Sequence, residues 1–92
     1  MRLDMFLKTS RLVPRRSVAQ EFCDAGLVTV NETAAKSSKE IKAGDVVEIR
    51  RASRSTKLLV VDVPATKQVS KNSAGELYQV LEENIIADNP LN

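Results

Sequence analysis

The chain has 92 residues, 42% of them hydrophobic, which suits one small domain and excludes a disordered tail. One cysteine and no histidine exclude an internal disulfide and a Cys–His zinc site, and no apolar run reaches about 18 residues, so we expect a cytoplasmic protein with no signal peptide or membrane span. Residues 1–57 carry a net charge of +5 and residues 58–92 one of −3, which predicts two surfaces with different partners or, alternatively, a merely solvated acidic face.

Two short helices are predicted at the start of the chain. Leu3, Phe6 and Leu7 have helical spacing, and this helix should end before Pro14 because the residue preceding a proline resists helical geometry. Pro14 suits the first turn of a second helix, and Gly26 is expected just after its end in the left-handed conformation. The apolar side of this second helix comprises Val18, Ala19, Phe22 and Cys23.

Three strands are predicted in the middle of the chain. Residues 28–30 and 47–49 alternate in the manner of half-buried strands, and the apolar run 58–63 is typical of a covered strand. A turn is expected at Asn31-Glu32, after the first strand. The intervening segments are interpreted as a polar loop at residues 33–45 and a basic connector at residues 50–57.

The end of the chain predicts a third helix. Ser73 and Glu76 form an S-x-x-E capping box. Apolar residues follow at helical spacing, namely Leu77, Val80, Leu81 and Ile85. We therefore expect a domain over residues 1–64 and, over residues 65–92, a linker with an acidic C-terminal helix at 74–87. The fold class predicted is α+β, with two N-terminal helices packed on a small, mostly antiparallel sheet, plus this C-terminal helix.

The basic residues near the N-terminus predict a phosphate-binding surface. Residues 2–19 contain five basic side chains against a single acid, Asp4, and such clustering is the electrostatic footprint of a nucleic-acid-binding protein. Asp4 is interpreted as an organiser that holds an arginine or caps the first helix. The candidate RNA-binding residues are Arg2, Lys8, Arg11, Arg15, Arg16 and Lys36. A second contact by Arg50, Arg51 and Arg54 and a merely soluble hairpin tip are equal alternatives for the connector.

The aromatic residues indicate what kind of RNA feature is recognised. Single-strand binders need exposed rings on which bases stack. Phe6, Phe22 and Tyr78 are the only aromatic residues, and both phenylalanines have core spacing. We therefore expect the protein to recognise the backbone shape and phosphate positions of folded RNA.

No set of residues indicates catalysis. Histidine is absent, and the glycines, at positions 26, 44 and 75, are too scattered for a phosphate-binding loop. Cys23 lies on the apolar face of the second helix, where an inert core thiol is expected. We expect no enzyme activity, no cofactor and no metal site.

The first fifty residues resemble a known family. The matching positions are Arg2-Leu3-Asp4, Phe6-Leu7, Ser10-Arg11, Arg16-Ser17, Ala19, Gly26, Val28, Val30-Asn31, Lys36, Ser38 and Gly44-Asp45. This pattern resembles the S-four RNA-binding domain, also called the alpha-L motif, and the resemblance points first to Arg2 and Arg16 as RNA contacts. Two departures stand out: Glu32 replaces the glycine usual after Asn31, and Met5 stands where a basic residue is common.

Within this family, the short chain and acidic end are most similar to the stand-alone members that serve in ribosome-associated quality control. This resemblance implies a monomer that binds large ribosomal subunits obstructed by peptidyl-tRNA and contacts both ribosomal RNA and tRNA. It also implies the partner factor RqcH, which adds alanine tails to stalled nascent chains. The alternatives are a recycling role like that of the heat-shock S-four protein and a protein–protein adaptor that uses the acidic C-terminal helix.

Overall fold

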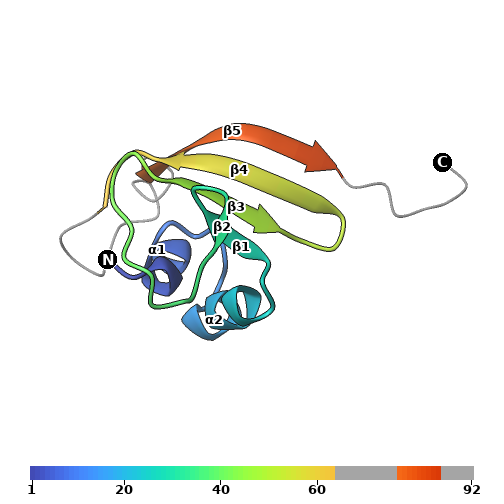
Figure 1. Cartoon of the computed structure of the whole chain (residues 1–92), viewed down its shortest axis with the longest axis horizontal. Coiled ribbons are helices and arrows are strands. Elements are labelled where there is room, and N and C mark those ends of the chain that lie inside the picture. Colours follow the sequence, from blue (N-terminus) through green and yellow to red (C-terminus); the bar gives the residue numbers. More distant parts are fainter. Residues whose placement is uncertain (64–76, 86–92) are drawn as a thin grey trace, which may run out of the picture.

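The computed structural model describes residues 1–63 and 77–85, in which two helices cover one face of an antiparallel sheet (Figure 1). The helices are α1 (Leu3–Thr9) and α2 (Arg16–Asp24). The strands are β1 (Val28–Val30), β2 (Thr33–Ala34), β3 (Val46–Arg50), β4 (Arg54–Val60) and β5 (Tyr78–Ile85). The predicted fold class is therefore confirmed in its two helices and its antiparallel sheet. No helix in the described ranges is long and apolar enough to cross a membrane.

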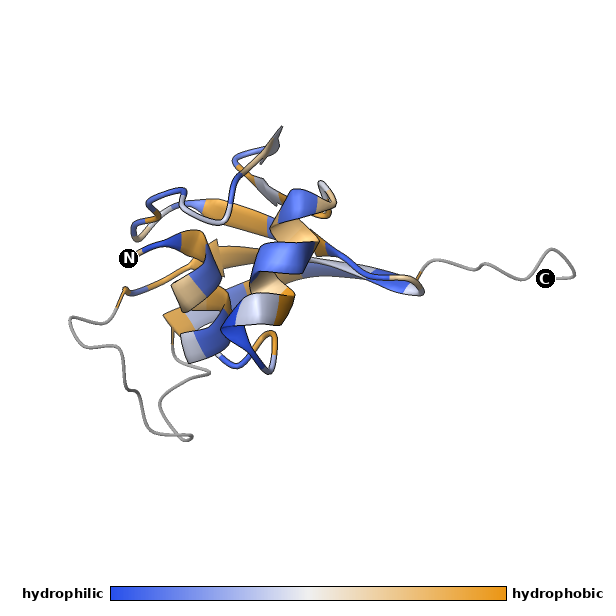
Figure 2. Ribbon diagram, turned by 90° about the horizontal axis from the view of Figure 1, so that it is seen from below, coloured by the Kyte–Doolittle hydropathy of each residue, from blue (hydrophilic) through white to orange (hydrophobic). Residues whose placement is uncertain are grey.

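The sheet has the strand order β2-β1-β3-β4-β5, and every neighbouring pair is antiparallel. Val28 pairs with Ile49, and Val47 pairs with Leu58, so the buried positions of three strands share one face. The helices pack on this face, and Figure 2, seen from the helix side, shows hydrophobic strand segments behind hydrophilic bands on the helices. The largest fully buried apolar side chains are Phe6, Leu3, Leu7, Ile49, Leu58, Val28, Val47 and Val60.

Positive φ angles confirm two local predictions, a glycine after the second helix and a turn at Asn31-Glu32. Gly26 follows the last residues of α2 with φ 75°, as predicted for a glycine after a helix. Asn31 and Glu32 have φ 52° and 72°, so both central residues of the β1–β2 turn are left-handed. The Asn31 side chain supports this turn, because it accepts from the Val46 amide at 3.0 Å and donates to Asp45 at 3.2 Å.

The predicted C-terminal helix is wrong where the structure describes it. Residues 78–85 form β5, which pairs with β4 along its length and completes the sheet as an edge strand. A register shift between Lys57 and Leu58 leaves Leu81 without a partner on β4, because Glu82 faces Lys57 and Val80 faces Leu58. Such a bulge breaks the alternation expected of a strand and produces the helical spacing seen in the sequence. The capping box at Ser73 and Glu76 lies outside the described residues.

The basic connector predicted at residues 50–57 is also corrected. Arg50 ends β3 and β4 begins at Arg54, so a tight hairpin replaces most of the connector. The Arg51 amide closes this hairpin by donating to the Arg54 carbonyl at 2.7 Å. The division of the chain at residues 64 and 65 stays a prediction, because residues 64–76 are not among those described.

Candidate nucleic-acid interface

The buried carboxylate of Asp4, in the first turn of α1, is the centre of the candidate site. Its side chain has no exposed surface. Oδ2 accepts from Arg16 Nε at 3.0 Å and from Gln20 Nε2 at 2.9 Å. Oδ1 accepts from the Met5 amide at 2.8 Å and lies 3.4 Å from Arg2 Nε, an ion pair without hydrogen-bond geometry. Asp4 therefore joins the first turns of α1 and α2, and its predicted organising role is that of holding arginines.

The two arginines held by Asp4 use only their Nε atoms in these contacts. Both face the carboxylate through Nε, and both side chains are 43% exposed. Within residues 1–63 and 77–85, no hydrogen bond or ion pair uses the terminal nitrogens of Arg2 or Arg16. A guanidinium has five N–H donors, so the outer donors of each arginine can bind phosphate oxygens in pairs.

The electrostatics of Asp4 favour the ionised form. Burial alone would raise the pKa of this carboxyl, but hydrogen bonds from Gln20, Arg16 and the Met5 amide, together with the positive charge of Arg16, hold its pKa below the ordinary value of 3.8. The carboxylate therefore stays charged at neutral pH. A charged acceptor keeps the arginine side chains in place before any ligand arrives, which lowers the entropic cost of binding.

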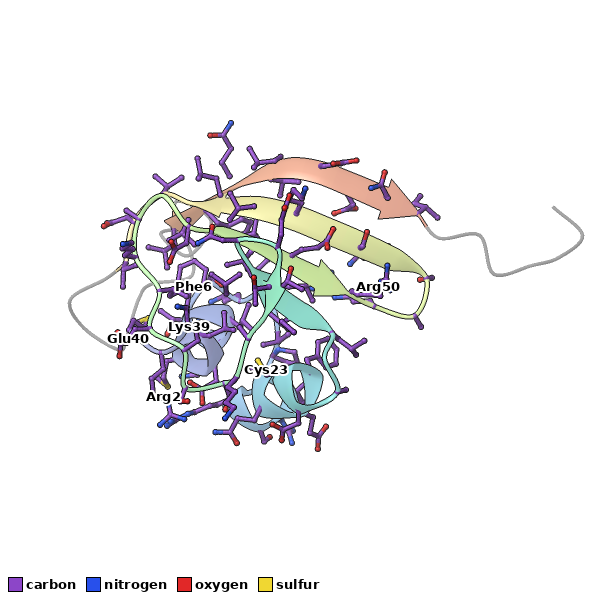
Figure 3. The ribbon with its side chains drawn as sticks, viewed as in Figure 1. Arg2, Phe6, Cys23, Lys39, Glu40 and Arg50 are labelled. Carbon is purple, nitrogen blue, oxygen red and sulfur yellow. The ribbon has the colours of Figure 1, made fainter. Side chains whose placement is uncertain are left out.

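The loop between β2 and β3, which carries Lys36, is hydrogen-bonded to the start of α1. The first turn of α1 donates two amides to the loop, from Leu3 to the Lys39 carbonyl at 2.7 Å and from Asp4 to the Ser37 carbonyl at 3.1 Å. These bonds satisfy helix-start amides that have no partner within the helix. Lys36 and Lys39 are both exposed on the loop. Figure 3 shows Arg2 and Lys39 on the same side of the molecule.

The other predicted residues of the first set lie around the connection between the helices. Lys8 is exposed in the last turn of α1, and Arg11 follows in an exposed, left-handed turn with φ 62°. Arg15 is the exposed N-cap residue of α2, immediately before Arg16. Pro14 therefore precedes the second helix and does not form its first turn, which places Arg15 outside the apolar side of that helix.

The structure does not bring the second predicted set to the Asp4 cluster. Arg50 is exposed at the β3–β4 hairpin, far from Arg2 in Figure 3. Arg51 Nη2 donates to the Leu12 carbonyl at 2.8 Å, so this side chain braces the connection between α1 and α2. Arg54 pairs with Glu83 on β5 at 3.6 Å. An RNA contact by these three arginines stays a prediction.

Sequence reasoning missed two residues of the site. Gln20 is not among the predicted site residues, but it is half-buried and donates to Asp4. Its position four residues after Arg16 on the same helix was an available signal, because residues at this spacing are neighbours on a helix surface. Lys39 had no such signal, since only the folded loop places it beside the start of α1.

The sulfur and aromatic side chains have structural roles. Cys23 is buried, and burial followed by the negative charges of Asp4 and Asp24 raises the pKa of its thiol to about 11. The thiol is therefore protonated at neutral pH, which agrees with the predicted inert core residue. Phe6 is fully buried, and Phe22 and Tyr78 pack against the core. No cluster of potential metal ligands occurs in the described parts of the chain.

Comparison with known proteins assigns the family. The S4 domain family model matches residues 1–47, which include the Asp4 cluster and the Lys36 loop. A Halalkalibacterium halodurans protein named RQC P-site tRNA stabilizing factor is 43% identical over 95% of this chain and 97% of its own length. A Streptococcus pneumoniae protein of the same name is 42% identical over 97% of this chain and 99% of its own length.

A solved structure agrees with this assignment. The trimeric structure of Vibrio cholerae Heat Shock Protein 15 superimposes with a TM-score of 0.79 and 26% identity, over 87% of this chain and 80% of that protein. The chain belongs to the S4 domain family and, within it, to the family of proteins named RQC P-site tRNA stabilizing factor.

Proposed function

We propose that this protein is a non-catalytic, RNA-binding factor of ribosome-associated quality control. It binds large ribosomal subunits that still hold a peptidyl-tRNA, and it contacts ribosomal RNA and the P-site tRNA. In the cytoplasm it acts as a monomer that supports alanine tailing of the stalled chain by RqcH. The name shared by its relatives supports a contact with P-site tRNA and a role in quality control.

The observation that carries the proposal is the Asp4 cluster. One buried carboxylate holds Arg2 and Arg16 through Nε, and their outer nitrogens remain available to phosphates. Because the described aromatic side chains pack in or against the core, the surface offers charge and shape rather than rings for base stacking. Such a site suits the sugar–phosphate backbone of folded RNA, which both ribosomal RNA and tRNA present.

The test is co-sedimentation with purified large subunits, with and without a trapped peptidyl-tRNA. Wild-type protein should prefer the obstructed subunit, and Arg16→Ala should lose affinity by about tenfold or more, equivalent to about 1.4 kcal/mol. The control is Lys57→Ala, which removes the same charge from the opposite sheet face, since its β4 neighbours Thr56 and Leu58 are buried beneath the helices.

The outcomes separate the parts of the proposal. Equal binding by wild type and Arg16→Ala, with both proteins folded by circular dichroism, would contradict the site. Equal binding of wild type to empty and obstructed subunits would contradict the peptidyl-tRNA preference. Alanine tailing in a reconstituted reaction that is the same with and without this protein would contradict the support of RqcH.

A further inference from the structure

A groove beside the Asp4 cluster has the features of an anion site. It lies between the β1–β2 hairpin and the loop that follows β2, with a volume of ≈ 490 Å³. Polar lining side chains come from Asn31, Thr33, Lys36, Ser38 and Lys39, and no acidic residue within 1–63 and 77–85 lines it. The groove therefore combines two ammonium groups with amide and hydroxyl donors.

The backbone holds this groove in a defined position relative to Arg2 and Asp4. The Lys39 amide donates to the Lys36 carbonyl at 3.0 Å, which closes a turn between the two lysines. The carbonyls of Ser37 and Lys39 in turn accept from the first amides of α1. The helix that carries Asp4 and the loop that carries the lysines are therefore hydrogen-bonded to each other.

The charge of the groove is not neutralised by its surroundings. Lys36 and Lys39 are exposed, and neither forms an ion pair within residues 1–63 and 77–85. Glu40 and Asp45 line a neighbouring hollow that shares Asn31 and Lys39 with the groove. Glu40 pairs with the N-terminal ammonium at 2.9 Å. Asp45 is engaged in holding the Asn31 side chain and the Lys42 amide, so it does not compete for the lysines of the groove.

We propose that this groove binds a phosphate of the RNA backbone, adjacent to the phosphates held by Arg2 and Arg16. The inference rests on the proposed function and extends it, because the bound backbone then runs from the arginine pair across the loop. Lysine acts as a point charge without a preferred orientation, so the groove adds affinity and register without recognising bases. No aromatic residue lines the groove, which agrees with recognition of the backbone alone.

The salt dependence of binding tests the groove. Log affinity falls as log salt rises, and each phosphate contact that is lost reduces the steepness of this fall by about 0.7 to 0.9. The affinity for obstructed large subunits is measured between about 50 and 200 mM salt for wild type, Lys36→Ala, Lys39→Ala and the control Lys57→Ala. In each groove variant the slope should be less steep by the amount of one phosphate contact, and the affinity at low salt should fall about three- to tenfold. Lys39→Arg should restore both, and the control should match wild type.

The design separates failure of the groove from failure of the proposed function. Wild-type slopes in both groove variants, while Arg16→Ala loses binding, would overturn the groove alone. If wild type does not bind subunits, the same variants are measured on purified tRNA. A lysine-dependent slope there would retain the groove and overturn the ribosomal role, whereas no binding to either RNA would overturn both.

Discussion

Arg16 and Gln20 donate to the same oxygen of Asp4, at 3.0 and 2.9 Å, from positions one helical turn apart on α2. Gln20 therefore helps to hold the Arg16 guanidinium in place indirectly, because it restrains the carboxylate to which Arg16 is bonded. This arrangement assigns a structural purpose to an uncharged residue within a basic surface. It also implies that the proposed RNA-binding surface can be weakened without removing a positive charge.

Replacement of Gln20 by alanine should therefore lower RNA affinity while the fold is kept. The Asp4 carboxylate loses one of its donors, and a hydrogen bond to a charged group contributes about 1.5–3 kcal/mol. We expect a smaller loss of subunit binding than for Arg16→Ala. The matched control is Gln79→Ala on β5, which removes an exposed glutamine. Wild-type affinity of Gln20→Ala would show that Arg16 alone is sufficient to orient itself.

Removal of the Asp4 charge should change the response of stability to acid. The folded pKa of Asp4 lies below its ordinary value of 3.8, so the ionised carboxylate stabilises the fold fully above that value. This contribution is lost as the pH falls through the lowered pKa. Asp4→Asn should be less stable than wild type near pH 7 by about 1–3 kcal/mol, and the difference should shrink in acid.

Urea unfolding of both proteins between about pH 7 and pH 2 measures this difference. Glu21→Gln serves as the control, because it neutralises an exposed acid on α2 that has no ion pair among the described residues. Parallel curves for wild type and Asp4→Asn across the acid range would contradict a structural role for the ionised form.

The N-terminal half of the fold could be predicted because its signals are local. Leu3, Phe6 and Leu7 pack at helical spacing, and Gly26 has the positive φ expected after a helix. The arginines around Asp4 were predicted by charge clustering and by the family pattern. The side-chain hydrogen bonds to Asp4 were not predictable, because the contact between Asp4 and Gln20 depends on how α1 and α2 cross.

The C-terminal part could not be predicted because its structure depends on distant residues. Strand β5 forms as the partner of β4, and no local pattern in residues 77–85 reports the free edge of a strand whose paired residues lie 18 to 31 positions earlier. The start of β4 was predicted as a connector for the same reason, because its residues are polar and its partner strand is distant in the sequence. Thr56 is buried there, and its hydroxyl donates to Glu83 of β5 at 3.3 Å.

Glu32 should be a site of stored backbone strain. Its φ of 72° lies in the left-handed region, which costs a residue with a side chain about 1–2 kcal/mol relative to glycine. Glu32→Gly should therefore raise the free energy of unfolding by about 0.5–1 kcal/mol, after the greater freedom of glycine in the unfolded chain is included. Thermal unfolding measures the change. The control Glu48→Gly, in the middle of β3, should lower stability instead.

The contribution of β5 to the core is tested by two leucines, four residues apart in the sequence, that differ in burial. Leu77, just before the strand, is buried, and its carbonyl accepts from the amides of Val61 and Asp62 at 2.8 and 3.2 Å. Leu77→Ala should cost about 2–4 kcal/mol, because truncation of a buried leucine removes packing and leaves a cavity. Leu81 is half exposed at the bulge, and Leu81→Ala should cost less than about 1 kcal/mol.

Chemical unfolding of these two variants decides whether the last strand belongs to the domain that carries the Asp4 cluster. A single cooperative transition, shifted for Leu77→Ala and nearly unchanged for Leu81→Ala, is expected because β5 extends the same sheet on which α1 and α2 pack. A separate low-stability transition confined to the C-terminal part would instead make β5 an appendage. In that case a protein truncated after residue 63 should still bind RNA with wild-type affinity.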